Sequence, residues 1–191
     1  MGDVMSFGRR VPALRVDDLP DGFTKAALAR RESPQIVYSF STDPEREQSL
    51  ESWGDLSAII GSIGCQAERA SVRLHWSAGG RRLAADVLGS APLDRLIVRW
   101  EDSALEEGLT ARPWYVTYAE PARRLAKVPI GKVPHDFDSL ADEQVDALEG
   151  LDFAWVPEEA VLSEAAAVAA LETFFASGGA EESGMLVREK K

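Results

Sequence analysis

Alternation of apolar and polar residues is the clearest pattern in the middle of the chain. It runs through residues 71–77, stops at a glycine-containing turn at residues 78–80, and resumes in residues 83–87. A spacing of two places side chains on one face of a strand, and a short glycine turn joins antiparallel neighbours. The alternation recurs in residues 95–102 and 114–118. Short connections of this kind predict an antiparallel meander, because parallel strands need long crossovers.

A helical pattern replaces the alternation near the end of the chain. Residues 164–176 are rich in Ala, Leu and Glu, and Val168, Leu171 and Phe175 recur at intervals of three and four. This spacing predicts a helix with one apolar face. Ser163 is suited to cap its first turn, and Gly178-Gly179 to end it. The following residues 185–188 (MLVR) predict a short last strand.

The remaining elements follow weaker signals. Residues 36–40 are β-branched and aromatic, which predicts a strand. Asp43-Pro44 resembles a helix cap followed by a first helical residue, and residues 55–62 are the firm part of that helix. Residues 125–133 predict another strand, placed at an edge because Pro129 lacks a backbone N–H.

The order of these elements predicts an α+β fold. We expect an antiparallel meander sheet with helices packed on one face, and a C-terminal helix followed by a short strand. Residues 1–35 alternate Pro, Gly, Arg and Asp with few large apolar residues, so they predict a loosely packed N-terminal extension. Residues 36–191 then form a single domain, a length that buries a sizeable core.

Net charge narrows the classes of partner. The formal charge is -11 and the sequence pI is about 4.7. Sequence-independent binding to nucleic acid or to an anionic membrane needs a positive face, so we expect neither partner. The single Cys65 excludes an internal disulfide framework, and no segment predicts a signal peptide or a membrane span. We therefore expect a cytoplasmic protein with a basic protein partner.

Candidate catalytic side chains are few. His75 lies within a predicted strand, which favours a structural role, and Cys65 has no neighbouring base. His135 precedes Asp136 and Asp138 in a predicted loop, but this spacing matches no established metal motif. Paired glycines occur only at predicted turns and helix ends. We therefore predict no catalytic site, no cofactor and no metal, and the chain is not expected to be an enzyme.

Acidic residues are concentrated in one part of the chain. Residues 69–132 carry eleven Lys or Arg against seven Asp or Glu, whereas residues 136–182 carry thirteen acids and no Lys or Arg. One interpretation is a solvated surface that keeps the protein soluble. The other is a docking surface, because complementary potentials accelerate association with a basic partner.

One aromatic residue fits the second interpretation. Trp76, Trp100 and Trp114 alternate with aliphatic residues on predicted strands, which favours the core. Trp155 instead precedes Pro157 in a predicted acidic loop, where an exposed ring would serve as an interface anchor. The predicted partner-binding residues share an acidic or aromatic side chain within residues 136–159. They are Asp136, Asp138, Asp152, Trp155, Glu158 and Glu159.

The last third of the chain resembles a known family. Residues 153–179 contain an apolar residue and Pro, a connection into a helix, an aromatic helix end and a glycine stop, in the order found in immunity protein family 1 of bacterial polymorphic toxin systems. The strands upstream are similar in order and spacing, so the resemblance extends over about residues 36–188. The positions that carry it are Phe153, Pro157, Val161, Val168, Leu171, Phe174, Phe175, Gly178 and Gly179.

The resemblance implies a small cytoplasmic α+β protein that neutralises a co-encoded toxin. Such families are commonly linked to nucleic-acid deaminases or nucleases. We therefore expect stoichiometric binding of a cognate, basic toxin through the acidic surface. Two alternatives remain: a non-catalytic regulatory or scaffolding module of another bacterial assembly, and a small enzyme that uses His135, Asp136 and Asp138.

Overall fold

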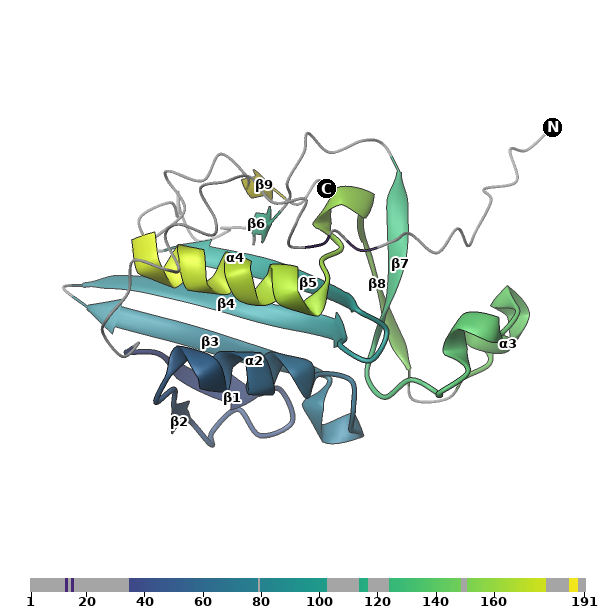
Figure 1. Cartoon of the computed structure of the whole chain (residues 1–191), viewed down its shortest axis with the longest axis horizontal. Helices are drawn as coiled ribbons and strands as arrows, with labels where there is room; N and C mark the ends of the chain where they lie inside the picture. Colours follow the sequence, from purple (N-terminus) through teal and green to yellow (C-terminus); the bar gives the residue numbers. More distant parts are fainter. Residues whose placement is uncertain are drawn as a thin grey trace.

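Seven strands form one antiparallel sheet in the computed structural model, which describes residues 13, 15, 35–78, 80–102, 114–116, 124–148, 151–177 and 186–188. The strand order is β2-β1-β3-β4-β5-β6-β9, and every neighbouring pair is antiparallel (Figure 1). The predicted meander from β3 to β6 and the predicted last strand are confirmed. The strands are β1 (Val37–Phe40), β2 (Gln48–Ser49), β3 (Ser71–Ala78), β4 (Arg81–Ser90), β5 (Arg95–Asp102), β6 (Trp114–Val116) and β9 (Leu186–Arg188).

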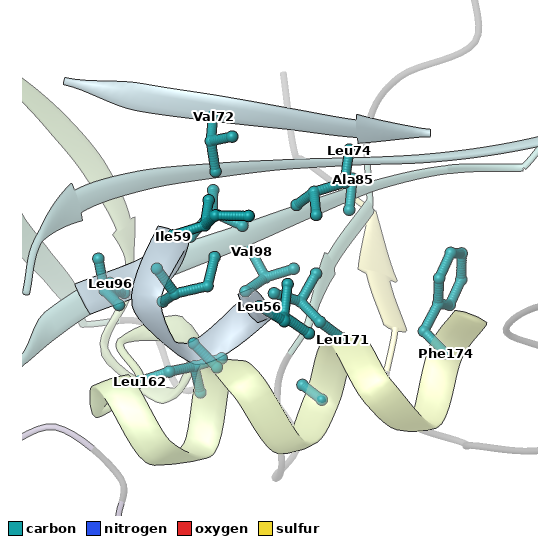
Figure 2. Packing of buried hydrophobic residues seen from close by; sticks show 14 of the residues in the cluster. Leu56, Ile59, Val72, Leu74, Ala85, Leu96, Val98, Leu162, Leu171 and Phe174 are labelled. Carbon is teal, nitrogen blue, oxygen red and sulfur yellow. The ribbon is translucent and has the colours of Figure 1, made fainter. Parts of the chain in front are cut away.

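Two helices cover one face of this sheet. Figure 1 shows α2 (Trp53–Gly61) and α4 (Glu164–Ser177) lying side by side in front of the strands. Leu56 and Ile60 are one helical turn apart in α2 and are fully buried, as is Leu171 of α4. Figure 2 shows Leu56 and Leu171 within the core under the sheet. Trp100 of β5 completes this core by packing its ring against Phe174. The predicted α+β fold with helices on one face is therefore confirmed.

A second, two-stranded sheet packs on the other face. β7 (Leu125–Ile130) pairs with β8 (Asp152–Pro157), and we call this pair the β7–β8 ribbon. Alternation along β5 explains how both faces become buried, because Leu96 faces the helices while Ile97 faces the ribbon. The ribbon and Ile97 form a second apolar cluster, whose buried residues are Ile97, Ala126, Val128, Ala154, Val156, Ala160 and Val161.

The ribbon corrects two sequence-based expectations. Residues 125–130 form the predicted edge strand, but it belongs to a separate two-stranded sheet with β8 and does not extend the meander. Residues 152–157, expected to form an acidic loop, are that partner strand. The acidic flanks and Pro157 obscured a period of two in which Ala154 and Val156 point inward.

Short elements connect these layers. The segment between β7 and β8 contains η3 (Phe137–Ser139) and α3 (Asp142–Asp146), and Phe137 and Val145 are buried within it. The 3₁₀ helix η2 (Ala67–Arg69) leads into β3. A second one, η4 (Glu158–Ala160), follows β8 and leads to Leu162, which forms an isolated antiparallel bridge with Leu96 shortly before α4.

The predicted helix start at Asp43-Pro44 is wrong. Residues 43–46 form turns, and α2 begins after Ser52. The hydroxyl of Ser52 accepts a hydrogen bond from the Asp55 N–H, and the Asp55 carboxylate accepts one from the Ser52 N–H. This reciprocal capping makes Ser52 the N-cap of the helix, eight residues after Pro44, with Asp55 as the acid three residues later.

The predicted start of α4 is confirmed and has a second contributor. The Ser163 hydroxyl accepts a hydrogen bond from the Ala166 N–H at 3.1 Å. The carboxylate of Asp94, in the turn between β4 and β5, accepts another from the Glu164 N–H at 2.7 Å. The predicted stop at Gly178-Gly179 lies outside the described residues.

Three residues of the predicted N-terminal extension, residues 1–35, are described: Ala13, Arg15 and Gln35. Ala13 is half-buried and packs against the cluster under the ribbon. This contact links one point of residues 1–35 to the rest of the molecule, and the prediction of a loose extension otherwise lies outside the described residues.

Candidate functional site

The β7–β8 ribbon carries the aromatic residue that the sequence marked as an interface anchor. Its inward side chains bury the second apolar cluster, so residues of the opposite parity point away from the large sheet. Trp155 is one of these, and it is 47 % exposed. Its predicted exposure is confirmed, but a strand holds it rather than a loop.

Leu125 lies on the same outward face and was missed by sequence reasoning. The register pairs Leu125 with Pro157 and Lys127 with Trp155, so Leu125 and Trp155 are diagonal neighbours. Leu125 is 58 % exposed, and with Trp155 it makes up the large apolar side chains that are exposed among the described residues. The signal was present in the sequence, because Leu125, Lys127 and Pro129 alternate with the inward-facing residues of β7.

Lys127 is the basic residue of this outward face. Its Nζ lies 4.1 Å from the centroid of the Phe153 ring and forms an ion pair with Asp146 of α3. A cation over an aromatic face is attracted to its π electrons, and a carboxylate contact neutralises it further. The amino group is thus held between two groups of its own chain.

The predicted acids near Trp155 occupy different positions. Asp152 is exposed at the start of β8, but it has the parity of the inward-facing Ala154 rather than that of Trp155. Glu158 and Glu159 follow the strand in η4 and are half-buried. The three carboxylates therefore surround the ends of the ribbon instead of flanking the Trp155 ring directly.

The two acids near His135, Asp136 and Asp138, differ in their contacts. Asp136 is exposed, whereas Asp138 forms an ion pair with Arg95 of β5, with 3.0 Å between its Oδ1 and the guanidinium Nη1. The Arg95 side chain is largely buried, so this pair fixes η3 to the start of β5. The Asp138 charge is therefore partly neutralised within the chain, and Asp136 is the more accessible of the two.

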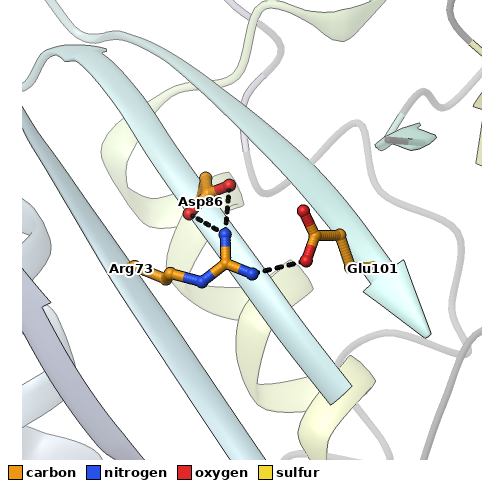
Figure 3. Close-up of polar contacts among 3 residues, drawn as sticks. All are labelled: Arg73, Asp86 and Glu101. Atoms are coloured by element: carbon orange, nitrogen blue, oxygen red, sulfur yellow. Dashed lines mark hydrogen bonds and ion pairs between the residues drawn. The ribbon is translucent and has the colours of Figure 1, made fainter. Parts of the chain in front are cut away.

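A polar cluster crosses the large sheet on the face away from the helices. Arg73 of β3 donates two hydrogen bonds from Nη1 to the carboxylate of Asp86, at 3.0 and 2.9 Å, and its Nη2 pairs with Glu101 of β5 (Figure 3). Arg73 and Asp86 are direct cross-strand partners in the register, and Figure 3 shows the guanidinium between the two carboxylates. Cross-strand pairs of opposite charge stabilise a sheet.

The pKa values of Arg73 and Asp86 reflect the sharing of one guanidinium between two carboxylates. Burial raises the pKa of Asp86, and the charge of Glu101 adds to that effect against the opposing attraction of Arg73. Burial alone would lower the pKa of Arg73, but hydrogen bonds and charges from Glu101 and Asp86 raise it. Both pKa values thus shift upward: burial, with the charge of Glu101, outweighs the attraction of Arg73 at Asp86, whereas the two carboxylates outweigh burial at Arg73.

The other candidate chemical groups lie apart. His75 is partly buried, with its Nε2 3.7 Å from Glu47, which agrees with a structural side chain. His135 is exposed, and so is Cys65, whose thiol donates to the Gly61 carbonyl. Within the described ranges, no three His, Cys, Asp or Glu side chains gather in an arrangement able to hold a metal ion.

Comparisons with known proteins leave the resemblance to immunity protein family 1 as a prediction. No protein-family model, curated protein or solved structure matches the chain. Among the described residues, none of the helices has the length and apolar character needed to cross a bilayer.

Proposed function

We propose that this chain is an immunity protein, which binds and neutralises a cognate bacterial toxin in a stoichiometric complex. The observation that carries the proposal is Trp155, exposed on a preformed strand within a stretch, residues 136–182, that has thirteen acids and no Lys or Arg. Interface energy is concentrated in aromatic anchors of this kind. Acidic groups around an anchor favour a basic partner over other proteins.

The toxin in this proposal acts on nucleic acid. Enzymes of that class need a positive surface to hold phosphates, and that surface complements a chain with a net charge of -11. The resemblance of residues 153–179 to the immunity family implies the same class, a deaminase or a nuclease. Neutralisation requires tight binding and no turnover, so rigid strands and a charged rim are sufficient for the role.

The test is protection from a toxin. The gene adjacent to the one for this chain is expressed in a bacterial host, alone and together with this chain, and growth is measured. We expect the adjacent product to arrest growth and the chain to restore it. The two purified proteins should then form a one-to-one complex whose association rate constant falls as salt increases.

A charge-reversal pair tests the acidic surface. Asp152→Lys with Glu158→Lys should lower the association rate constant about tenfold at low salt and weaken its salt dependence, because rim charges act mainly on association. The matched control, Glu45→Lys with Glu51→Lys, makes the same change in net charge at exposed positions near β2, at the far side of the large sheet (Figure 1). Equal rates for the two variants would contradict a localised acidic surface.

A further inference from the structure

The outward face of the β7–β8 ribbon carries two exposed apolar side chains, Leu125 and Trp155, next to Lys127. The register places three pairs on this face: Leu125 with Pro157, Lys127 with Trp155, and Pro129 with Phe153, of which Pro129 is buried and Phe153 half-buried. The large exposed side chains are Leu125 and Trp155, in diagonal contact range across the two strands. An exposed aromatic and an exposed aliphatic side chain adjoining on one rigid strand pair form the kind of centre that protein interfaces use.

The ribbon is held rigid from both sides. Its inward face buries Val128 and Val156 against Ile97 of the large sheet. On its outward face, Lys127 lies over the Phe153 ring and pairs with Asp146, which ties α3 to the ribbon. A preformed surface loses little conformational entropy when a partner binds. The same contacts keep the Lys127 charge from opposing a basic partner.

Prolines interrupt both edges of the ribbon. The Glu158 N–H donates to the Arg124 carbonyl at 3.3 Å, so that pair is hydrogen-bonded and the next pair, Leu125 with Pro157, is not. Alternation makes Pro129 with Phe153 a non-hydrogen-bonded pair as well. Backbone groups of such pairs point away from the partner strand, so Pro129 removes a donor from the edge of β7 and Pro157 removes one from the edge of β8. An added strand would meet an incomplete row of donors at either edge, which favours docking on the face.

We infer that the outward face of the β7–β8 ribbon, centred on Leu125 and Trp155, is the anchor against which the toxin docks. This inference rests on the proposed function and adds an apolar centre to its acidic surface. The partner chemistry that fits is a basic protein surface on which an Arg or Lys lies beside apolar side chains. An Arg guanidinium stacks on a Trp face, and carboxylates at the rim satisfy its remaining donors.

Charge around the ribbon supports a basic occupant. The segment that connects the two strands contributes Glu143 of α3, and Glu158 follows the end of β8, while the charge of Asp146 is already paired with Lys127. Figure 1 shows α3 beside the end of the ribbon, away from the helices that cover the large sheet. A second copy of this chain would bring like charges together at this position, which disfavours self-association through the same face.

Truncation of the two anchors tests the inference. In the complex with the toxin encoded beside this chain, Leu125→Ala with Trp155→Ala should raise Kd by about 30-fold or more, because anchor residues contribute at this level. The matched control, Leu125→Met with Trp155→Phe, keeps apolar area at both positions and should stay within about threefold of wild type. Thermal unfolding of each variant reports whether the fold is kept.

A second measurement needs no variant that shortens the anchors to Ala. The difference between the Trp fluorescence of the wild type and that of Trp155→Phe isolates the Trp155 signal, which should shift to shorter wavelength and resist iodide quenching in the complex. A complex in which Trp155 stays quenchable, or which the alanine variant forms with unchanged Kd, would overturn the ribbon assignment and leave the proposed function standing. Absence of any complex with the wild-type chain would overturn both.

Discussion

Gly89 shows how closely the backbone packs at the end of β4. Its φ is 122°, and a Cβ at this position would lie 2.3 Å from the Arg95 carbonyl oxygen, a distance that only backbone movement could relieve. Glycine tolerates both constraints because it has no side chain. The turn between β4 and β5 therefore depends on this residue, and the turn also supplies Asp94 to α4.

Substitution of Gly89 by Ala tests this constraint. We expect the free energy of unfolding to fall by about 3 kcal/mol or more, since an unfavourable φ costs about 1–3 kcal/mol before the clash is counted. Gly80→Ala is the matched control: its φ is 83°, but the space around it is open, so it should cost about 1 kcal/mol. Urea denaturation of both variants measures the difference, and equal losses would contradict the close contact at Gly89.

The raised pKa of Asp86 predicts that stability depends on pH in the opposite sense from that usual for an ion-paired acid. Its pKa is raised in the fold, chiefly by burial, so the folded state binds the proton more tightly than the unfolded chain. Its contribution to stability is therefore fully present below the ordinary pKa of 3.8 and is lost as pH rises through the raised value.

The comparison that isolates this effect is wild type against Asp86→Asn. As pH falls from 7 toward 4, the free energy of unfolding of the wild type should rise relative to that of the variant, because only the wild type gains a proton at this site. Urea denaturation at a series of pH values measures the difference. A relative loss of wild-type stability on acidification would mean that the Arg73 ion pair, rather than burial, dominates the pKa.

At the scale of the element, α4 depends on a residue far away in sequence. Asp94 has a φ of 54° and places its carboxylate on the Glu164 N–H, next to the Ser163 cap. Asp94→Ala should lower the free energy of unfolding by about 1–2 kcal/mol, because it removes a helix-end acceptor and a residue that tolerates positive φ. Asp94→Asn keeps both properties in part and should recover about half of the loss. Guanidinium denaturation distinguishes the variants, and no recovery by Asn would assign the effect to charge alone.

Elements with a strong local period were predictable from the sequence. The β3–β4 hairpin and β5 alternate at a spacing of two, and α4 combines a helical stripe with a serine cap, so short-range preferences agree with the tertiary structure there. The start of α2 was misread because Asp43-Pro44 is also favourable in turns, as the turn hydrogen bonds after Phe40 show. The Ser52 and Asp55 pair is the signal that identifies it.

The ribbon could not be deduced in the same way. β7 and β8 are separated by more than twenty residues, and their pairing depends on the shared burial of Val128 and Val156 against Ile97. No local pattern encodes that contact, because tertiary packing selects the partner of a strand. For the candidate surface, the sequence therefore identified Trp155 but not its neighbour Leu125, which the register alone brings beside it.

At the scale of the whole molecule, the acidic residues are not confined to the part of the fold that holds one of the two apolar clusters. The large sheet buries one apolar cluster under its helices and a second under the ribbon, so each face has its own core. The described acids between residues 136 and 177 lie on elements of both layers and in the connections between them, from η3 to α4. Some, such as Asp138 and Asp146, hold these elements together through Arg95 and Lys127. The accessible acidic surface is consequently smaller than the count of acids in this stretch.

The position of α4 over the large sheet sets an order of events during protein synthesis. Its partners Leu56, Leu74 and Trp100 leave the ribosome well before Leu171 and Phe174, which complete the cover over them. Until then, a sheet assembled from neighbouring strands exposes the apolar face that α4 later covers. Intermediates with exposed apolar surface are prone to aggregate or to bind chaperones. A nascent copy therefore completes the cover of this core only when α4 has emerged.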